Sequence, residues 1–375
     1  MKPLSVALVR QRYTPDGGAE RFVSRALHAL QGQGVAVTLI ARQWRGEPGV
    51  KTLNCDPGYY GRLWRDWSFA RAVCRLVRTH HFDLVQSHER IACCDIYRAG
   101  DGVHREWLQQ LARIRGPLGR FGMLVNPYHR YVLAAERRLF TSPQLKAVIC
   151  NSSMVKEEIQ RHFNLAAEKL HVIYSGVDTD SYHPRLREQR AQTRRQYDIP
   201  ETADLFLFVG SGFERKGVAT LIAAMSTLPD NNHLLIIGRD KHQSRYERLA
   251  RAHGLGARAR FLGSRPDVKP FYGAADALVL PTLYDPFPNV ALEAFAAGLP
   301  VITSPKCGAA ELIQHGQNGF VCDALDRDGL AACMRQFLAA DRSALMQAAR
   351  ETVTGLSLEA MSQRLLKLYE TVLSP

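Results

Sequence analysis

A chain of 375 residues, 46% of them hydrophobic and 23% charged, is long enough for two globular domains and too long for one ordinary core. No apolar run reaches the roughly 18 residues of a transmembrane helix, and the first run, about six residues long, is too short for the core of a signal peptide. The net charge of +13 is concentrated in residues 1–170, with 26 Lys and Arg against 14 Asp and Glu, so the first half is expected to meet nucleic acid, a membrane or a phosphorylated substrate.

Short apolar runs alternate with helical patterns along most of the chain. The candidate strands form two successive series, which are residues 4–9, 35–41, 82–87, 145–151 and 169–178, and then 204–210, 233–238, 259–263, 277–281, 299–304 and 319–322. Strand–helix alternation indicates parallel sheets with right-handed crossovers, and two series indicate two doubly wound α/β domains. Because such sheets bind ligands at the carboxyl ends of their strands, a cleft between the two domains is the expected site.

The junction between the domains is expected near residues 172–200, where the sequence is polar and rich in charge. We predict an amino-terminal domain in residues 1–175 and a carboxy-terminal domain in residues 176–355. Residues 356–375 are expected to form a terminal helix that packs back on the first domain.

The eight cysteines show neither CxxC spacing nor a paired pattern. This distribution favours neither a zinc site nor a disulfide framework. Free thiols in a reducing cytoplasm are therefore expected.

The first turn between a strand and a helix, "YTPDGGAERFV", contains the pair Gly17 and Gly18. Two glycines allow a narrow turn that can approach a diphosphate or a sugar, although a tight turn without a ligand is an alternative. The turn lacks the full GxGxxG pattern, so it is weak support for dinucleotide binding.

A second glycine-rich turn, "GSGFERKG" at residues 210–217, places Arg215 and Lys216 between an apolar run and a helical pattern. A helix N-terminus offers unpaired N–H groups and the positive end of the helix dipole. Arg215 adds a planar fork for two phosphate oxygens, and Lys216 adds a mobile point charge. The spacing differs from GxxxxGK[ST], which excludes an ATP-binding P-loop. The turn predicts an anion site, and a solvated loop is the alternative for the pair taken alone.

The stretch "YDPFPNVALEAFAAGLPVI" at residues 284–302 brings two carboxylates to one helix entrance. Asn289 is expected to cap a helix that stops at Gly298. Asp285 precedes this helix, and Glu293 lies about one turn inside it. Carboxylates accept hydrogen bonds from sugar hydroxyls, and helix N–H groups bind phosphate. The pattern favours a nucleotide sugar, and two surface carboxylates are the alternative.

Together these motifs resemble the retaining glycosyltransferases of family 4, which have the GT-B fold. The resemblance covers nearly the whole chain through "PDGGAER", "IYSGVDTDSYHP", "FVGSGFERKGVATLIAA", "YGAADALVLPTLYDPFPNVALEAFAAGLPVI" and "GQNGFVC". Within the family, "GGAERFVSRALHALQGQGVAVTLIARQWRGE" and "SGFERKGVATLIAAMSTLP" are most similar to the lipopolysaccharide inner-core glucosyltransferases. The resemblance implies two Rossmann-like domains facing across a cleft. It also implies transfer of a hexose, expected to be glucose, from a UDP-sugar to a lipopolysaccharide core with retained configuration.

The resemblance also implies roles for individual residues. Arg215 and Lys216 would neutralise the donor diphosphate and act in catalysis. Asp285 would contact hydroxyls of the donor sugar, and Glu293 would hold the ribose diol. The other donor-binding residues that it implies are Gly17, Gly18, Asn289 and Val290.

The chain departs from the family pattern at two positions. Asp285 stands where the family usually has Glu, and Pro288 replaces the usual glycine. Proline removes one backbone donor from the phosphate region. Both changes leave the donor and its exact contacts open.

In the first half, Asp101 of "RAGDGVH" matches an acidic position near the sugar in the core glucosyltransferases. His104 is a nearby alternative, and a structural role is possible for either. The triplets at 178–180 and 326–328 have the DxD pattern of a metal site, but turn and N-cap roles are expected for them. Neither a metal nor a cofactor is expected, because the two cations and a helix dipole can carry the diphosphate charge.

No carboxylate is evident as the nucleophile of a double displacement, so we expect front-face substitution, in which the departing phosphate takes the acceptor proton. Three alternatives remain. The first is a family member with another donor or a lipid acceptor. The second is a nucleotide-sugar 2-epimerase, which the early GGAE turn and the junction motif disfavour. The third is a nucleic-acid-binding protein, which would need aromatic residues among the cations of a recognisable module.

Two basic segments of the first half contain large apolar residues. In residues 61–78 a stripe is expected to pack on the sheet of its own domain, and it consists of Leu63, Trp67, Ala70, Cys74 and Val77. Residues 105–140 hold seven Arg against two Glu, include Trp107, Phe121 and Tyr128, and are interrupted by Gly116, Pro117 and Gly119. This composition suits an anionic bilayer surface. We predict peripheral binding to the inner face of the cytoplasmic membrane, where a lipid-anchored, phosphorylated acceptor would lie.

Overall fold

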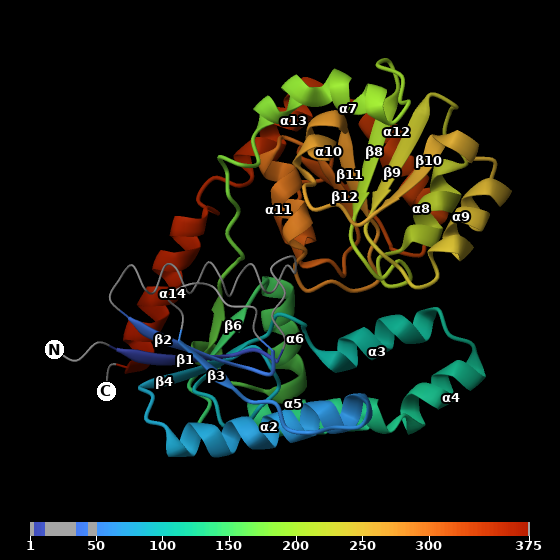
Figure 1. Ribbon diagram of the computed structural model, residues 1–375. Coiled ribbons are helices and arrows are strands. Elements are labelled where there is room, and N and C mark those ends of the chain that lie inside the picture. Colours follow the sequence, from blue (N-terminus) through green and yellow to red (C-terminus); the bar gives the residue numbers. More distant parts are fainter. Residues whose placement is uncertain (1–3, 12–34, 44–50, 374–375) are drawn as a thin grey trace. The chain divides into compact units, whose positions relative to one another are not determined.

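The computed structural model describes residues 4–11, 35–43 and 51–373. The chain divides into two compact units (Figure 1). Unit 1 comprises residues 1–175 together with 358–375, and unit 2 comprises residues 176–357. The turn that contains Gly17 and Gly18 lies outside the described residues, as does the helix expected after it.

Unit 1 is built on a seven-stranded parallel sheet with the order β3-β2-β1-β4-β5-β6-β7. Its central strand β1 pairs with β2 through Val6 and Val37, and with β4 through Val6 and Leu84. Most of the strands are buried on both faces, which explains their nearly continuous hydrophobic runs. The strands are β1 (Ser5–Val9), β2 (Ala36–Ala41), β3 (Lys51–Asn54), β4 (Leu84–Ser87), β5 (Ile96–Arg98), β6 (Ala147–Cys150) and β7 (Leu170–Val172).

Helices cover both faces of this sheet. Alternate residues of β1 enter different cores, so Ala7 and Val9 pack with α2, α5 and α6, while Val6 and Leu8 pack with α14. Through Leu365 and its apolar neighbours, the last helix of the chain thus completes the core of unit 1 (Figure 1). The helices of unit 1 are α2 (Gly61–Thr79), α3 (His104–Arg113), α4 (Pro117–Val125), α5 (Pro127–Phe140), α6 (Ser153–Phe163) and α14 (Leu358–Leu373).

Unit 2 has a six-stranded parallel sheet with the order β10-β9-β8-β11-β12-β13. The strands are β8 (Asp204–Val209), β9 (Asn232–Ile237), β10 (Ala259–Gly263), β11 (Ala277–Leu280), β12 (Val301–Thr303) and β13 (Gly319–Val321). The helices are α7 (Arg190–Gln196), α8 (Val218–Met225), α9 (Gln243–Ala252), α10 (Lys269–Ala274), α11 (Asn289–Ala296), α12 (Arg327–Ala339) and α13 (Arg342–Glu351). Phe206 and Phe208 of β8 are fully buried in the core of unit 2. The apolar run at residues 204–210 therefore forms an interior strand of the sheet, as predicted.

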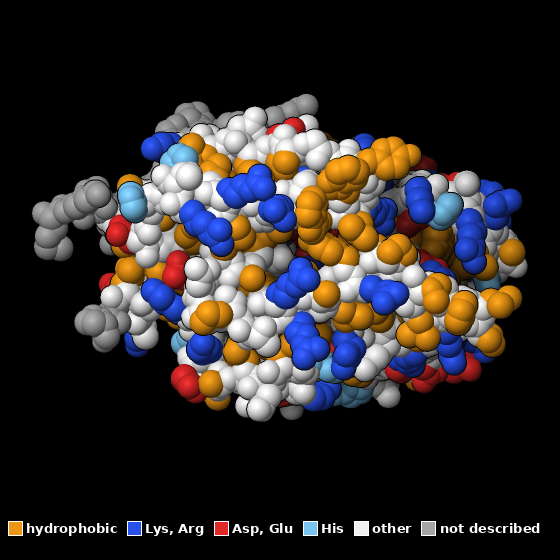
Figure 2. All heavy atoms as spheres, turned by 90° about the horizontal axis from the view of Figure 1, so that it is seen from below, with side chains coloured by type: hydrophobic (Ala, Val, Ile, Leu, Met, Phe, Trp, Pro, Cys, Tyr) orange, Lys and Arg blue, Asp and Glu red, His pale blue; other side chains and the backbone are white. Residues whose placement is uncertain are grey.

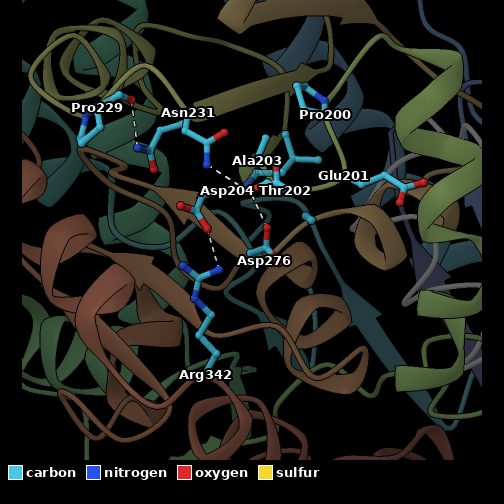
Figure 3. Close-up of polar contacts among 12 residues, drawn as sticks. Pro200, Glu201, Thr202, Ala203, Asp204, Pro229, Asn231, Asp276 and Arg342 are labelled. Atoms are coloured by element: carbon cyan, nitrogen blue, oxygen red, sulfur yellow. Dashed lines mark hydrogen bonds and ion pairs between the residues drawn. The ribbon is translucent and has the colours of Figure 1, made fainter.

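The charged segment expected to be a linker is part of unit 2. Arg194 of α7 is fully buried, and its Nη2 donates to Asp276 Oδ2 at 2.8 Å. Asp276 also accepts from the backbone N–H of Leu205, at the start of β8. Figure 3 shows Asp276 beneath residues 200–204, with Asp204 paired to Arg342 at 2.6 Å. The charge of this segment anchors a helix to the sheet instead of marking a flexible connection.

Two further predictions about unit 1 need correction, one of them only in part. Cys74 of α2 forms a disulfide with Cys93, which follows β4, while the other six cysteines keep free thiols. The expected stripe on α2 is partly right, since Ala70 and Val77 pack against the core of unit 1, whereas Leu63 is 36% and Trp67 42% exposed. The fully buried residues of the helix are Ser68, Phe69 and Val73. Spacing along the chain could show neither result, because both depend on how α2 lies against the sheet.

Candidate functional site

The glycine-rich turn at residues 210–217 joins β8 to α8 and depends on close packing. Gly217 has a φ of +73°, and a Cβ there would lie 1.9 Å from the carbonyl oxygen of Pro281. A Cβ on Gly210 would lie 2.7 Å from Cδ of Lys216. Both glycines therefore let the turn fold tightly at the carboxyl end of β8, with the Lys216 side chain over Gly210.

Asp285 joins the two cations of this turn. Its Oδ2 accepts from Lys216 Nζ at 2.8 Å and from Arg215 Nη1 at 3.0 Å. Asp285 and Lys216 are buried, whereas the Arg215 side chain is 36% exposed. Burial alone would raise the pKa of the Asp285 carboxyl, but Lys216 and Arg215 outweigh it and hold the pKa below its usual value. The group is therefore an ionised carboxylate between two cations, with a net charge of +1 that can attract an anion.

Glu293 lies inside α11 and is buried. Its Oε2 accepts from the hydroxyl of Tyr272, a residue of α10, at 3.0 Å. The Tyr272 hydroxyl also lies 3.4 Å from the carbonyl oxygen of Val290. Sequence reasoning missed Tyr272, because its position in "FYGAAD" gives no sign that α10 packs against α11.

The helix start differs by one residue from the expected one. Pro288 occupies the N-cap position without a side-chain hydrogen bond, and Asn289 is the first residue of α11, so the predicted Asn289 cap was wrong. The predicted stop was right, since α11 ends at Ala296 and Gly298 follows with a φ of +77°. Asp285 thus precedes α11 and contacts Arg215 and Lys216, whereas Glu293, the fifth residue of α11, contacts Tyr272.

In unit 1, Asp101 and His104 lie in very different surroundings. The Asp101 side chain is 58% exposed, and its Oδ2 lies 3.4 Å from Nη1 of Arg90. His104 is buried, and its Nε2 lies 3.1 Å from Nδ1 of His129. Burial, together with the charges of Arg90 and His129, lowers the pKa of His104 to about 3, so this imidazole is neutral at pH 7. Asp101 is the one of the two that presents a charged group to solvent.

Arg90 and Glu136 hold the loop that carries Asp101, and sequence reasoning missed both. Arg90 Nε donates to Glu136 Oε1 at 2.9 Å, and Arg90 Nη2 donates to the carbonyl oxygen of Gly102 at 3.3 Å. Glu136 Oε1 also accepts from the backbone N–H of His104 at 2.9 Å. Arg90, which follows β4, and Glu136 of α5 therefore hold the backbone of residues 101–104 in place through hydrogen bonds.

The two DxD triplets have the expected structural roles. Asp178 Oδ1 accepts from the backbone N–H groups of Asp180 and Ser181 in a turn. Asp326 caps α12 by accepting from the N–H of Gly329. Among the residues that the structure describes, no group of three or more His, Cys, Asp or Glu could hold a metal ion.

Comparisons with known proteins identify the family. Residues 16–181 match the model of Glycosyltransferase Family 4, and residues 189–352 match that of Glycosyl transferases group 1. The lipopolysaccharide core biosynthesis glycosyltransferase LpsE of Rhizobium meliloti (strain 1021) is 33% identical over 362 residues, which are 94% of this chain and 96% of LpsE. The lipopolysaccharide glucosyltransferase WaaG of Escherichia coli (strain K12) is 28% identical over 323 residues, or 84% of each chain.

A solved structure agrees with these matches. The crystal structure of WaaG, described as a glycosyltransferase involved in lipopolysaccharide biosynthesis, superimposes with a TM-score of 0.84 at 26% identity and covers 97% of this chain and 99% of its own. The predicted pair of Rossmann-like parallel-sheet domains is thereby confirmed. The chain therefore belongs to the family 4 glycosyltransferases with the GT-B fold, and it is a glycosyltransferase related to the enzymes of the lipopolysaccharide core.

Proposed function

We propose that this enzyme transfers glucose from UDP-glucose to a lipopolysaccharide core acceptor with retention of the anomeric configuration. The observation that carries the proposal is the group formed by Arg215, Lys216 and Asp285 at the carboxyl end of β8. It supplies cations for a diphosphate and a carboxylate for sugar hydroxyls, which is the chemistry that a nucleotide sugar needs. The names of LpsE and WaaG support the choice of acceptor, and that of WaaG supports the choice of sugar.

The reaction would follow from this arrangement. When the donor binds, its diphosphate replaces the Asp285 carboxylate as the partner of Arg215 and Lys216. Asp285 can then accept hydrogen bonds from hydroxyls of the donor sugar. Glu293, oriented by Tyr272, accepts from the ribose diol. The bond between C1 and the phosphate oxygen breaks as the acceptor oxygen bonds C1 from the same face. The departing phosphate takes the acceptor proton, and the two cations stabilise the charge on UDP.

The test is transfer to truncated lipopolysaccharide cores with a panel of UDP-, GDP- and ADP-sugars. We expect transfer from UDP-glucose, an α-linked product, and the same rate after dialysis against EDTA. Equal or better transfer from another donor would show that the enzyme prefers a different nucleotide sugar. Asp285 and Pro288, the two departures from the family pattern, would then be the candidate causes. Loss of activity in EDTA that Mn²⁺ or Mg²⁺ restores would contradict the metal-independent mechanism.

We expect different defects from the two carboxylates of the donor site. Asp285→Asn should lower kcat more than it weakens UDP binding, because its contacts are with the sugar that moves. Glu293→Gln should weaken UDP binding itself, measured by calorimetry. Glu247→Gln on α9 is a matched control outside the site, with no expected effect. The reverse pattern, weaker UDP binding for Asp285→Asn alone, would contradict the assigned roles.

We also propose that unit 1 binds the anionic inner face of the cytoplasmic membrane. Helix α4 exposes an apolar face, on which Leu118 is 90%, Phe121 64%, Leu124 75% and Val125 52% exposed. These residues are spaced three, four and seven apart, so they share one side of the helix. Such an exposed apolar face suits a contact with the bilayer interface. Within the described residues, no helix has the length and apolarity needed to span a bilayer.

Arginines and aromatic residues extend this surface. Figure 2 shows hydrophobic and basic side chains together across the face seen from below, where α2, α4 and α5 lie. At the start of α2, Tyr60 is 88% and Trp64 51% exposed, and Trp67 lies under the guanidinium of Arg71. Aromatic rings with polar edges favour the bilayer interface, and each Arg near an anionic surface contributes about 1 kcal/mol.

The membrane proposal predicts a specific loss of binding. Phe121→Ser/Leu124→Ser should reduce co-sedimentation with vesicles of phosphatidylglycerol and phosphatidylethanolamine at least about tenfold, because it removes two exposed apolar side chains that would enter the bilayer interface. Leu325→Ser, a partly exposed leucine of unit 2, is the control. Added salt should weaken binding by the wild-type protein. Equal binding to neutral and anionic vesicles, or none at low salt, would contradict the proposal.

A further inference from the structure

A pocket with a basic lining lies among α3, α5 and α6 of unit 1 and contains none of the residues assigned above to the donor. Its volume is about 520 Å³, which is within the roughly 300–1,000 Å³ of small-molecule sites. Its polar lining consists of Arg105, Arg137, Thr141 and His162. Among the described residues, no carboxylate lines this pocket. The lining therefore predicts an anionic ligand.

One hydrogen bond between α3 and α5 brings the two arginines to the same pocket. Glu136 Oε1 accepts from the backbone N–H of His104 at 2.9 Å, and Glu136 is itself paired with Arg90. Arg105 follows His104 on α3, and Arg137 follows Glu136 on α5. The contact that joins the two helices thus also positions the backbone of both arginines.

The guanidinium groups of Arg105 and Arg137 are available for a ligand. Both residues are exposed, and neither forms an ion pair within the part of the chain that the structure describes. Glu106, the carboxylate of α3, is buried and already occupied. Its Oε1 lies 2.8 Å from Nε2 of His162 and 3.5 Å from Nη1 of Arg161. The positive charges of Arg105 and Arg137 are therefore left uncompensated.

The helix ends at the pocket change this charge balance only a little. Thr141 follows the last residue of α5, and Phe163 is the last residue of α6, whereas Arg105 lies in the first turn of α3. A carboxyl end carries about half a negative charge and an amino end about half a positive charge. The three ends together oppose the two full cations by about half a charge. The pocket thus remains strongly positive.

A phosphomonoester is the anion that this charge matches. It carries a charge of about −1.5 to −2 at pH 7 and offers three acceptor oxygens, which guanidinium groups bind in pairs. A phosphodiester carries a single negative charge and would leave one arginine uncompensated. Leu133 and Phe163, both half-buried, form an apolar part of the wall. The carbon skeleton of a phosphorylated sugar can pack on them.

We propose that this pocket binds a phosphomonoester group carried by the sugar acceptor, through Arg105 and Arg137. The proposal rests on the proposed function for the identity of the acceptor. It adds the part of the enzyme that distinguishes a phosphorylated core from an unphosphorylated one. A lipid headgroup is the other source of the same phosphoryl chemistry, and vesicle binding separates the two sources.

The most direct test compares two neighbouring arginines. Arg137 lines the pocket, whereas Arg138 is also exposed in the last turn of α5 but does not line it. Either alanine variant removes one charge from the same helix end, so only the pocket differs. Arg137→Ala should raise the KM for a deacylated, phosphorylated core oligosaccharide about tenfold or more, the usual effect of losing a hydrogen bond between charged groups. Arg138→Ala should leave it unchanged, and neither variant should change the KM for UDP-glucose.

Removal of the phosphate is the matching change in the ligand. Treatment of the same oligosaccharide with alkaline phosphatase should raise its KM for the wild-type enzyme by a similar factor. Arg137→Ala should then have no further effect on this KM. An equal effect of Arg137→Ala on both forms of the oligosaccharide would overturn the proposal, because the arginine would then not recognise the phosphate.

A second pair of variants changes the charge of the pocket and keeps both arginines. Ala134 lines the pocket and is exposed, so a longer polar side chain there leaves the core intact. Ala134→Glu places a carboxylate three residues before Arg137, within reach of its guanidinium. It should raise the KM for the phosphorylated oligosaccharide severalfold, whereas Ala134→Gln, of the same size, should not. An equal rise in both variants would contradict recognition by charge.

Vesicle binding identifies the source of the phosphoryl group. With vesicles of phosphatidic acid and phosphatidylethanolamine, Arg137→Ala and Arg138→Ala should lose co-sedimentation to the same extent, because each removes one charge from unit 1. A larger loss for Arg137→Ala, together with an unchanged KM for the phosphorylated oligosaccharide, would assign the pocket to a lipid headgroup and overturn the proposal.

Failure of the proposed function has a different signature. If the wild-type enzyme transfers glucose to neither form of the oligosaccharide, calorimetric binding of the two forms still decides the role of the pocket. Tighter binding of the phosphorylated form, weakened at least about tenfold by Arg137→Ala, supports the proposal. Equal binding of the two forms, or no binding of either, overturns it.

Discussion

Replacing both Arg215 and Lys216 by alanine is expected to lower kcat/KM at least about 10²-fold, because removal of one preorganised electrostatic stabiliser typically has an effect of this size. The buried Asp285 carboxylate would then remain with no cation beside it and would repel the donor diphosphate. Both effects act on the charge that develops on the leaving group. The measurement is steady-state transfer from UDP-glucose, with calorimetric binding of UDP as a second readout.

The control for this variant separates local from general charge effects. Arg248 and Arg251 are exposed on α9 of the same unit, and their double alanine variant removes the same formal charge. It should keep wild-type kcat/KM. The fold of Arg215→Ala/Lys216→Ala should survive with a lower Tm, because the variant leaves the buried Asp285 carboxylate unpaired but leaves the apolar core of unit 2 intact. Near-normal kcat/KM in this folded variant would show that Arg215 and Lys216 do not bind the donor diphosphate.

Asp276→Ala is expected to lower the free energy of unfolding of unit 2 by about 3–5 kcal/mol, the usual effect of removing one partner of a buried ion pair. Asp276 accepts from Arg190 at 2.7 Å, from Arg194 at 2.8 Å and from the backbone N–H of Leu205 at 2.9 Å. Its loss would leave the fully buried Arg194 guanidinium without its carboxylate.

Urea unfolding measures this change, which should be confined to unit 2 because the hydrogen-bond partners of Asp276 all lie in that unit. Arg194 Nη1 also donates to the carbonyl oxygens of Pro200, Glu201 and Ala203, so it connects α7 to the segment before β8. Asp230→Ala is the control, because its side chain is 97% exposed although it pairs with Arg258. Exposed pairs contribute about 0–1 kcal/mol. A loss below about 1 kcal/mol for Asp276→Ala would show that Arg194 is held by its backbone partners alone.

The sequence was sufficient for the class of fold and for the core of the proposed donor site. Buried parallel strands need apolar side chains on both faces, and this requirement is local enough to be visible as short hydrophobic runs between helical patterns. In such a fold, the turns that carry ligand-binding residues lie at the carboxyl ends of the strands. The motif around Arg215 and Lys216 and the motif around Asp285 therefore could be expected to meet, and they do, 69 and 70 residues apart in the chain.

Only the tertiary structure decided the partners that come from distant segments without a motif. Tyr272 meets Glu293 because α10 packs near α11, and Arg90 meets Glu136 across 46 residues because β4 ends beside α5. The same holds for the Cys74–Cys93 disulfide and for the outward aromatic residues of α2. Hydrophobic periodicity reports which side of a helix is apolar, but it does not report which apolar side chains the core has room for. That choice depends on how each helix lies on the sheet, and so on residues far away in the sequence.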